Sequence, residues 1–549
     1  MSGATFKEST VLEATVFPTR EETVIRYLLE RNAAEAPSET CVSFESGTTW
    51  TRLDCLHAAY ASANQLYAAG VRQGDRVAVF LPNGEDFIRA WWGLCALGAV
   101  IVPINPIFRG AMLQRVLDIG ELAAIVVDAE RHDLVAGKPG SPDIVVGPQD
   151  LYGEDYAPTP LAKPVEPWDP VALIMTSGTT GPSKLVTVTS MYFAHGAAAF
   201  FEREGLGRDD VMLMDLPMFH MAALCYTGGS LLTRTSVAIR DRPVLERYWE
   251  IARDVGATAC ILLSTMSSYL VSAEPRPAER EHRIKTACMS PLPADPEEFK
   301  RRFGIAKLWT TFGMSEAPSV MRGVEGDPGS TEPGYVGQPD RGYEARLVNE
   351  NDLEVEEGTP GELIIRTELP WVITPSYFGD PVTTVKAWRN GWFHTGDVMR
   401  KSTEGAYFFV DRAKDALRRR GEMISAFEVE RVVIGYAGVR EAACVAYPSD
   451  AGAEDEVKVF VVCDNAMPDW AELLRFCHAN MPHYMVPRYF ELIDELPKTP
   501  TLRVQKHLLR EQGNCTKTWD REAHGLSVTR RGIRESRETT TGRASLAEI

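Results

Sequence analysis

The spacing of apolar residues in the N-terminal part of the chain predicts alternating helices and strands. From Trp50 onward, apolar residues recur at intervals of three and four, as on one face of a helix: Leu53, Leu56, Tyr60, Ala63 and Tyr67. Thr51 and Asp54 can cap this helix, and Gly70 can end it. Short apolar runs typical of buried strands follow at residues 76–81, 100–103, 124–127 and 144–146. This half of the chain is therefore predicted to be α/β.

The pattern changes farther along the chain. Residues 160–170 form a proline-dense connector that leads into the apolar run 171–175. Strand patterns at 344–348 and 362–366 flank a turn-rich segment and indicate a β-rich subdomain. After Asp411 a compact unit of two helices and two strands is predicted at residues 427–436, 442–447, 457–463 and 470–480.

These patterns predict an α/β protein with two domains and a tail. A large N-terminal domain, residues 1–412, contains α/β subdomains and the β-rich subdomain. A small α+β C-terminal domain follows at residues 413–510. The sequence from Gly513 is polar and has little periodicity, so residues 511–549 are predicted to form a flexible, loosely ordered tail.

Composition and charge exclude several classes of protein. The 549 residues include 58 Lys and Arg against 76 Asp and Glu, a formal net charge of −18, which repels nucleic acid and anionic membranes. The ten cysteines contain no CxxC pair, which argues against a disulfide framework and a zinc site and favours a reducing cytoplasm. The N-terminus lacks a signal-peptide pattern, and the most apolar stretch, 91–103, is shorter than the roughly 20 residues of a membrane helix. We expect a cytoplasmic protein without nucleic-acid or membrane partners.

One segment carries the chemistry of phosphate binding. Directly after the apolar run 171–175 comes Thr176-Ser177-Gly178-Thr179-Thr180-Gly181-Pro182-Ser183-Lys184. Glycines allow unusual backbone angles, while hydroxyl groups, backbone N–H groups and a lysine suit phosphate oxygens. The segment is not a Walker A motif, because GxxxxGK[ST] does not fit its spacing. Taken singly, such a turn is more often an ordinary loop.

Further segments downstream change that interpretation. In order, they are Phe312-Gly313-Met314-Ser315-Glu316, Gly391-Trp392-Phe393-His394-Thr395-Gly396-Asp397, Asp411-Arg412-Ala413-Lys414-Asp415 with Arg420-Gly421 and Glu428-Val429-Glu430, and Pro497-Lys498-Thr499-Pro500-Thr501. Together with the phosphate loop they resemble the core motifs of the adenylate-forming superfamily. This superfamily includes acyl-CoA ligases, luciferases and the adenylation domains of nonribosomal peptide synthetases. The resemblance covers about residues 20 to 510.

The resemblance implies a site for the AMP part of an acyl adenylate. Ser315 would bind the α-phosphate and Glu316 would ligate Mg²⁺, a role that suits a hard oxygen ligand. Asp397 would accept hydrogen bonds from the ribose hydroxyls, assisted by Arg412. Further nucleotide contacts would come from Thr176, Ser177, Gly178, Thr179, Thr180, Gly181, Lys184, Phe312 and Gly313. The structural alternatives are a helix cap for Ser315 and Glu316 and a turn aspartate for Asp397.

The resemblance also implies that the C-terminal domain is mobile and serves two reactions. Lys414 occupies the hinge position, where backbone rotation swings the domain between an adenylating and a thioester-forming arrangement. Gly421 would line the tunnel for the pantetheine chain of CoA. His220 lies in a segment that resembles the gate of the acyl site, with a packing histidine as the alternative. The apolar residues 221–225 that follow favour a hydrophobic acyl group.

Two motifs depart from the family pattern. The last motif of the family ends in Thr/Ser-Gly-Lys, but this chain has Thr501-Leu502-Arg503. Arginine replaces a compact ammonium by a planar fork at the catalytic position, and leucine adds bulk where the loop approaches the ligand. In the phosphate loop, Ser183-Lys184-Leu185 replaces Pro-Lys-Gly. The departures affect the binding of ATP and pyrophosphate, while the residues that would bind AMP match the family motifs.

The sequence thus predicts an acyl-CoA ligase, an acid–thiol ligase that forms a thioester from an acyl adenylate and CoA and releases AMP. ATP would be used weakly or not at all. Its partners would be CoA as a substrate, the adenylate of a hydrophobic, bulky carboxylic acid, and a separate adenylating ligase in the same pathway of specialised metabolism.

Other functions remain open at this point. One alternative is a conventional two-step ATP-dependent synthetase, in which Arg503, Lys498 or Lys506 supplies the charge. Another is a non-catalytic adenylate-binding protein. A luciferase-like oxygenase is allowed by the fold. A peptide-synthetase adenylation domain is disfavoured, because the sequence after Arg510 is too short for a carrier domain.

Overall fold

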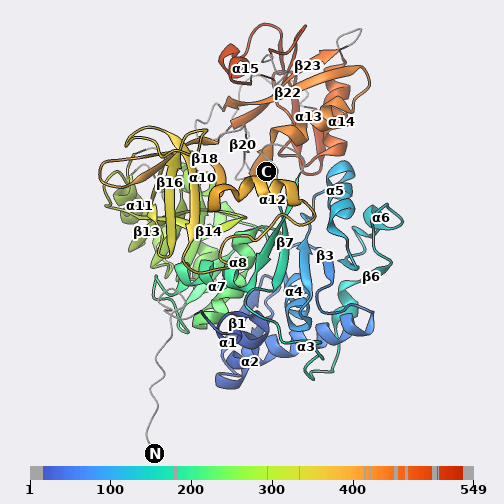
Figure 1. Ribbon diagram of the computed structural model, residues 1–549, viewed down its shortest axis with the longest axis vertical. Helices are drawn as coiled ribbons and strands as arrows, with labels where there is room; N and C mark the ends of the chain where they lie inside the picture. The colour runs from blue at the N-terminus through green and yellow to red at the C-terminus, as the bar shows by residue number, and fades with distance from the viewer. Residues whose placement is uncertain are drawn as a thin grey trace, which may run out of the picture. The chain divides into compact units, whose positions relative to one another are not determined.

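The computed structural model describes residues 17–176, 183–293, 295–332, 334–412, 416–419, 422–449, 455–463, 468–497, 504 and 506–535. The chain folds into two compact units, of which Figure 1 shows the elements. The first comprises Met1–Pro106, Asp118–Met175 and Leu185–Asp411, and the second comprises Ile107–Leu117, Thr176–Lys184 and Arg412–Ile549. Within the described ranges, no helix is long and apolar enough to cross a membrane.

The first unit contains a six-stranded sheet in the order β6-β5-β3-β4-β7-β8. Strand β3 pairs in parallel with both β4 and β5, and the side chains of β4 and β5 are all buried, as is typical of parallel strands covered on both faces. The strands predicted at the four apolar runs are confirmed. Their bounds are β3 (Arg76–Phe80), β4 (Val100–Pro103), β5 (Ala124–Val127), β6 (Ile144–Val146), β7 (Pro170–Thr176) and β8 (Lys184–Thr189).

The helix predicted after Trp50 is confirmed as α3 (Arg52–Ala68). The hydroxyl of Thr51 accepts the Asp54 N–H, and the Asp54 carboxylate accepts the Thr51 N–H, which forms a capping box. Other helices of this unit are α1 (Arg20–Thr23), α2 (Ile25–Glu35), α4 (Glu85–Leu97), α6 (His132–Val135), α7 (Ser190–Phe201), α8 (Met221–Thr233), α9 (Tyr248–Asp254), α10 (Ser264–Ser272), α11 (Pro296–Phe303) and α12 (Pro381–Ala387).

A second, larger sheet of the first unit is half parallel and half antiparallel. Its 13 strands follow the order β16-β17-β18-β19-β15-β14-β13-β12-β11-β9-β10-β1-β2. Strands β9 to β13 pair in parallel, whereas β13-β14-β15 and β16-β17-β18 are antiparallel, so the predicted β-rich subdomain is confirmed. The bounds are β1 (Thr40–Phe44), β2 (Thr49–Thr51), β9 (Val211–Met214), β10 (Ser236–Ile239), β11 (Ala259–Leu263), β12 (Thr286–Ser290), β13 (Lys307–Met314), β14 (Ala317–Val324), β15 (Tyr335–Pro339), β16 (Tyr343–Val348), β17 (Gly361–Thr367), β18 (Phe393–Lys401) and β19 (Tyr407–Arg412).

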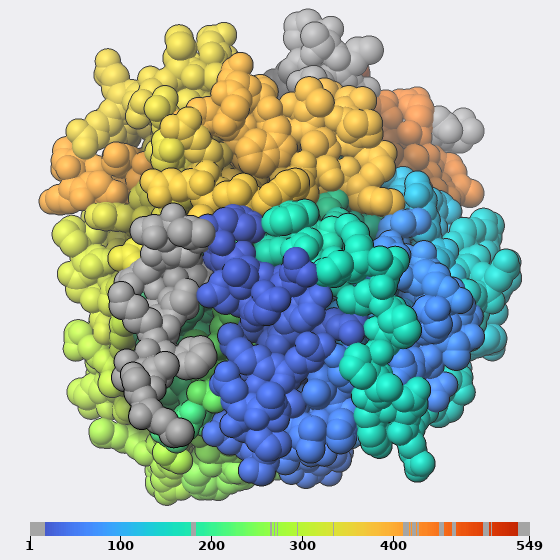
Figure 2. All heavy atoms as spheres, turned by 60° about the horizontal axis from the view of Figure 1, so that its bottom comes forward, coloured from blue at the N-terminus to red at the C-terminus, as the bar shows by residue number. Residues whose placement is uncertain are grey.

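The proline-dense connector is fixed to the surface of the first unit. The Lys163 N–H donates to Gln73 Oε1 at 3.1 Å, and Gln73 Nε2 donates to the Lys163 carbonyl at 2.9 Å. Figure 2 shows this segment in teal beside the blue N-terminal helices. The connector therefore fixes the position at which the chain enters β7.

The second unit contains the predicted C-terminal helices and strands, which are confirmed. Its main sheet has the order β22-β23-β24-β25, and α13 and α14 pack their apolar faces into the same core, where Val429, Leu474 and Val459 are fully buried. The bounds are β20 (Ala416–Arg419), β21 (Glu422–Ser425), α13 (Ala426–Ile434), β22 (Val439–Pro448), β23 (Asp455–Cys463), α14 (Trp470–Asn480), β24 (Tyr489–Leu492), α15 (Lys506–Gln512), β25 (Thr518–Asp520), β26 (Leu526–Thr529) and β27 (Gly532–Glu535). Helix α5 (Gly110–Gly120) begins in this unit.

The structure differs from the loosely ordered tail predicted after Gly513. Strand β25 extends the main sheet by pairing with β24, and β26 and β27 form a hairpin. Leu526 and Val528 are buried in the core of the unit, and a buried ion pair of 2.8 Å between Lys458 and Glu491 lies where β23 and β24 meet this segment. Only a few apolar residues are spread through the polar sequence, so its periodicity is weak although its core contacts are specific. Residues 536–549 lie outside the described residues.

Asp215, at the end of β9, makes the stability of the first unit depend on pH. Burial raises the pKa of its carboxyl to about 7, although its own backbone and Arg240 act in the opposite direction. The folded state therefore holds a proton that the unfolded state releases above about pH 4, and stability falls as pH rises toward 7. We expect a loss of roughly 2–3 kcal/mol between pH 5 and pH 8.

Asp215→Asn should remove this loss, as measured by chemical unfolding at both pH values. Asp209→Asn makes the same change of charge at an exposed position and should keep the slope of the wild-type protein. Equal slopes in the two variants would contradict the assignment to Asp215.

Candidate active site

Ser315 and Glu316 form the turn between the antiparallel strands β13 and β14. Phe312 pairs with Met321 and Met314 with Ala317, so one residue of β13 faces three of β14. Such a bulge bends the strand and redirects side chains. The bulge also requires an unusual backbone conformation, because Ser319 has a φ of +44°. A Cβ at Gly313 would lie only 2.9 Å from the Ser319 nitrogen. The glycine of the motif is therefore needed for the close approach of the two strands.

The tip of this hairpin is held from outside. The Tyr377 hydroxyl donates to Oε1 of Glu316 at 2.8 Å, and the Thr374 N–H donates to the Glu316 carbonyl at 2.7 Å. The Tyr192 hydroxyl donates to the Met314 carbonyl at 2.9 Å. These contacts fix both the backbone and the carboxylate of the half-buried Glu316.

The carboxylate of Glu316 fits a role in magnesium binding. Mg²⁺ prefers oxygen ligands and is usually bound by one or two carboxylates together with phosphate oxygens and water. Among the described residues, no group of three His, Cys, Asp or Glu side chains could hold a metal ion alone. Glu316 would therefore hold Mg²⁺ jointly with oxygens of a bound nucleotide.

Asp397 lies at a second bulge, in β18. Glu362 pairs with Val398 and Ile364 with His394, so one residue of β17 faces the three residues 395–397. Gly396 has a φ of +75°, which favours glycine, and Asp397 is only 2% exposed. The Thr395 hydroxyl accepts the Asp397 N–H at 3.1 Å and donates to the Leu363 carbonyl at 2.7 Å.

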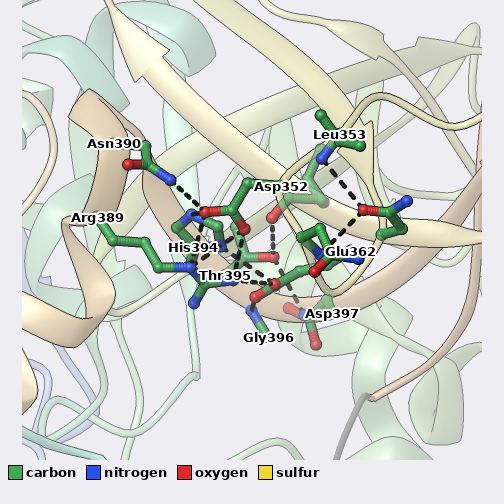
Figure 3. A network of polar contacts seen from close by, with 12 residues as sticks. Asp352, Leu353, Glu362, Arg389, Asn390, His394, Thr395, Gly396 and Asp397 are labelled. Carbon is green, nitrogen blue, oxygen red and sulfur yellow. Dashed lines mark hydrogen bonds and ion pairs between the residues drawn. The ribbon is translucent and has the colours of Figure 1, made fainter.

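A network of charged residues supports this bulge (Figure 3). Glu362 accepts the Gly396 N–H at 3.1 Å through Oε1, and its Oε2 lies 3.1 Å from Nδ1 of the buried His394. Arg389 contacts Asp352 at 2.8 Å and Glu362 at 3.3 Å. Burial alone would raise the pKa of the Glu362 carboxyl, but His394, Arg389 and the Gly396 N–H hold it below its usual range. Glu362 is therefore a carboxylate at neutral pH.

The phosphate loop lies between two neighbouring strands of the six-stranded sheet. Thr176 is the last residue of β7 and Lys184 is the first of β8, while Ser177, Gly178, Thr179, Thr180 and Gly181 lie outside the described residues. Leu185, which replaces the glycine of the family motif, is fully buried. Its bulk is therefore accommodated in the protein interior.

His220 lies at the N-cap of α8, where its side chain is exposed and its ring centre is 4.4 Å from that of Phe219. The apolar residues after it are part of the core, except for the exposed Ala222. Helix α8 packs tightly on α7, since a Cβ at Gly196 would come within 2.8 Å of Cys225 Sγ. Most of this apolar run thus serves helix packing.

Arg412 is the last residue of β19, and Lys414, Gly421 and Arg503 lie outside the described residues, as do Arg420 and Leu502.

Lys506, one alternative source of the catalytic charge, forms a 2.7 Å ion pair with Glu430 in which both side chains are 15% exposed. This pairing occupies its ammonium group in the described arrangement. Arg419 is buried and contacts Glu456 at 2.8 Å, which is a structural role.

Glu362, His394 and Tyr377 were not among the site residues predicted from the sequence. Glu362 contacts Gly396, 34 residues away, and His394, 32 residues away. Tyr377 contacts Glu316, 61 residues away in the chain. The register of β17 against β18 is the signal that places Glu362 beside Gly396.

Comparison with known proteins identifies relatives of the whole chain. AMP-binding enzymes are matched over residues 29–378, and the AMP-binding enzyme C-terminal domain is matched over residues 428–502. The chain is 28% identical over 519 residues to a crotonobetaine/carnitine–CoA ligase of Salmonella arizonae, covering 88% of this chain and 98% of the relative. It is 29% identical over 493 residues to a sulfoacetate–CoA ligase of Cupriavidus necator, covering 87% and 93%.

Solved structures show the same fold. An o-succinylbenzoate CoA synthetase from Bacillus subtilis has a TM-score of 0.79 at 22% identity, covering 88% of this chain and 98% of that one. An anthranilate CoA ligase in complex with anthranoyl-AMP has a TM-score of 0.66 at 21% identity, covering 89% and 97%. The predicted fold class, a large N-terminal α/β domain with mixed sheets and a small C-terminal domain, is confirmed.

Glu362→Gln tests whether the charged network supports the bulge at Asp397. Glutamine keeps an acceptor for the Gly396 N–H but removes the charge facing His394 and Arg389, so we expect about 1–2 kcal/mol less stability and about tenfold weaker binding of AMP. Because the folded pKa of Glu362 is lowered, its contribution is present at neutral pH and disappears on acidification below about pH 4.

Thermal unfolding and calorimetric titration with AMP measure both effects. The control is Glu344→Gln, which breaks an exposed ion pair with Arg366 on the neighbouring strands and should change stability by less than about 0.5 kcal/mol. Similar changes in the two variants would show that the network is unimportant.

Proposed function

Because the chain belongs to the family of AMP-binding enzymes, we propose that it is an ATP-dependent acid–CoA ligase. The observation that carries the proposal is the match to CoA ligases over nearly the full length of both chains. In the first half-reaction, a substrate carboxylate attacks the α-phosphorus of ATP and pyrophosphate leaves. In the second, the thiolate of CoA attacks the acyl carbon of the adenylate, and AMP leaves.

The residues of the two hairpins suit the nucleotide part of this reaction. We propose that Asp397 accepts hydrogen bonds from the ribose and that Ser315 contacts the α-phosphate. Glu316 would hold Mg²⁺, which neutralises phosphate charge when bound. Arg412 at the ribose, and Phe312 and Gly313 beside the nucleotide, complete the proposed site.

For the transfer to CoA we propose the roles that the motifs imply. Lys414 is the hinge, Gly421 lies beside the pantetheine chain, and His220 lies at the entrance of the acyl site. The support for these roles is the match between the motif order of this chain and that of its family.

A second candidate is an enzyme limited to the thioester half-reaction. The observation that favours it is Leu502-Arg503 at the place of the Gly-Lys pair. The buried position of Leu185 weakens this candidate, because one of the departures from the family motif then lies away from the surface of the loop. In the two-step ligase, the pairing of Lys506 with Glu430 leaves Arg503 or Lys498 as the source of the catalytic charge. A separate adenylating ligase would be needed only under this second candidate.

We propose a hydrophobic, bulky carboxylic acid as substrate. Its support is the exposed, apolar Ala222 that lies at the start of α8 after His220. The acid is best tested with a panel that includes aromatic, terpenoid-like and short polar acids.

Separate assays of the two half-reactions distinguish the two candidates. With MgATP and the correct acid, we expect pyrophosphate release that depends on the acid, followed by thioester formation when CoA is added. Pyrophosphate is measured with a coupled assay, and the thioester is measured by mass spectrometry. Thioester formation from a synthetic acyl-AMP without pyrophosphate release from ATP would establish the second candidate instead.

Substitutions in the altered motif Thr501-Leu502-Arg503 test the source of the catalytic charge. If Arg503 supplies the charge in a two-step ligase, Arg503→Lys should change acid-dependent pyrophosphate release by less than about tenfold. If adenylation has been lost there, Arg503→Lys with Leu502→Gly should raise it by about 10²–10³, the usual effect of one electrostatic donor. The thioester rate from acyl-AMP, measured in parallel, controls for misfolding of the variants.

A further inference from the structure

The segment 372–378 connects two elements that the proposed reaction needs together. It lies between β17 and α12, and its residues Val372, Thr374 and Tyr377 are buried. On one side it contacts β8, which leaves the phosphate loop. On the other side it contacts the turn that carries Glu316.

The contacts with β8 are made by the backbone and by the hydroxyl of Thr374. The Thr187 N–H donates to the Ser376 carbonyl at 3.0 Å, and the Phe378 N–H donates to the Leu185 carbonyl at 2.8 Å. The Thr374 hydroxyl donates to the Thr187 carbonyl at 2.8 Å. The segment therefore runs beside β8 like a short additional strand.

The contacts with the turn involve both the backbone and the carboxylate of Glu316. The Thr374 N–H binds its carbonyl and the Tyr377 hydroxyl binds Oε1, at 2.7 and 2.8 Å. Two contacts from α12 and the residue after it hold the segment in turn: Thr384 Oγ1 accepts the Tyr377 N–H at 3.0 Å, and Trp388 Nε1 donates to the Thr374 carbonyl at 3.1 Å.

We propose that Tyr377 is a positioning residue, which orients the Glu316 carboxylate for a metal-bound nucleotide. This inference rests on the proposed function, because it assigns Glu316 to Mg²⁺. A hydrogen bond to Oε1 fixes the plane of the carboxylate and leaves Oε2 able to ligate.

The energetic consequence should appear in the affinity for the metal more than in the affinity for the nucleotide. Residues that orient a metal ligand typically contribute 10- to 100-fold to metal affinity. A residue that only stabilises the fold would affect all ligands alike. The dependence of binding on Mg²⁺ therefore separates a positioning role from a structural one.

The experiment compares Tyr377→Phe with the wild-type full-length protein. Calorimetry measures ATP binding over a series of Mg²⁺ concentrations and AMP binding in the presence of EDTA. We expect Tyr377→Phe to raise the Mg²⁺ concentration for half-maximal ATP binding at least tenfold, and to change AMP binding without metal less than twofold.

The matched control is Tyr335→Phe. The Tyr335 hydroxyl is also buried and donates to a carboxylate, Asp327, at 2.7 Å, but this pair lies outside the proposed site. Both variants lose a similar hydrogen bond, so similar falls in unfolding temperature are expected, and only Tyr377→Phe should change the Mg²⁺ dependence. The same Mg²⁺ dependence in both variants would overturn the proposal, as would a loss of AMP binding in EDTA as large as the loss of ATP binding with Mg²⁺.

Glu316→Gln provides an independent test if Tyr377→Phe does not fold. It should likewise raise the Mg²⁺ concentration for half-maximal ATP binding. Where Tyr377→Phe does fold, the two effects should not add in the double variant, because Tyr377 acts through Glu316. A Glu316→Gln protein with wild-type Mg²⁺ dependence would refute the proposal. The proposed function fails separately, if wild-type protein binds MgATP but forms no thioester with any acid of the panel.

Discussion

The candidate site depends on two interruptions of antiparallel pairing. An antiparallel ladder pairs residues one to one, and each bulge leaves backbone groups that need other partners. At Gly396 the freed N–H binds Glu362, and in the turn next to the first bulge the Glu316 carbonyl binds the Thr374 N–H. Thr374 lies in the same segment as Tyr377, which holds the Glu316 carboxylate. The hydrogen bonds that the interrupted sheet requires therefore fix the backbone that carries Glu316 and Asp397.

The sequence predicted those features that are local. The strand at Val100–Pro103 and the helix at Trp470–Asn480 agree residue for residue, because burial and periodicity are encoded within a few positions. The support of the site is not local. Tyr377 lies 61 residues from Glu316, and no pattern in either segment indicates that they meet. Partners of this kind follow only from strand register, which depends on the whole sheet.

In the part of the chain that the structure describes, buried ion pairs hold the framework together, and this distinguishes the framework from the site. The nearly buried Glu204 contacts both Lys307 and Arg322, which ties the end of α7 to β13 and β14. Such pairs fix elements in place but offer no free ligand. The half-buried carboxylate of Glu316 instead receives one neutral hydrogen bond from Tyr377, which orients it without neutralising its charge. This arrangement suits the proposed role of Glu316 in holding a cation.

Strand β25 has a consequence for the solution behaviour of the protein. It covers the outer edge of β24 by pairing Thr518 to Asp520 with residues 489–491. An uncovered strand edge is a template for pairing with other molecules and often leads to aggregation. A chain shortened to the boundary of the matched C-terminal domain, near residue 502, would expose that edge together with the apolar faces of Trp519 and Phe490. The segment after Gly513 thus protects β24 and its apolar neighbours from direct pairing with a second chain.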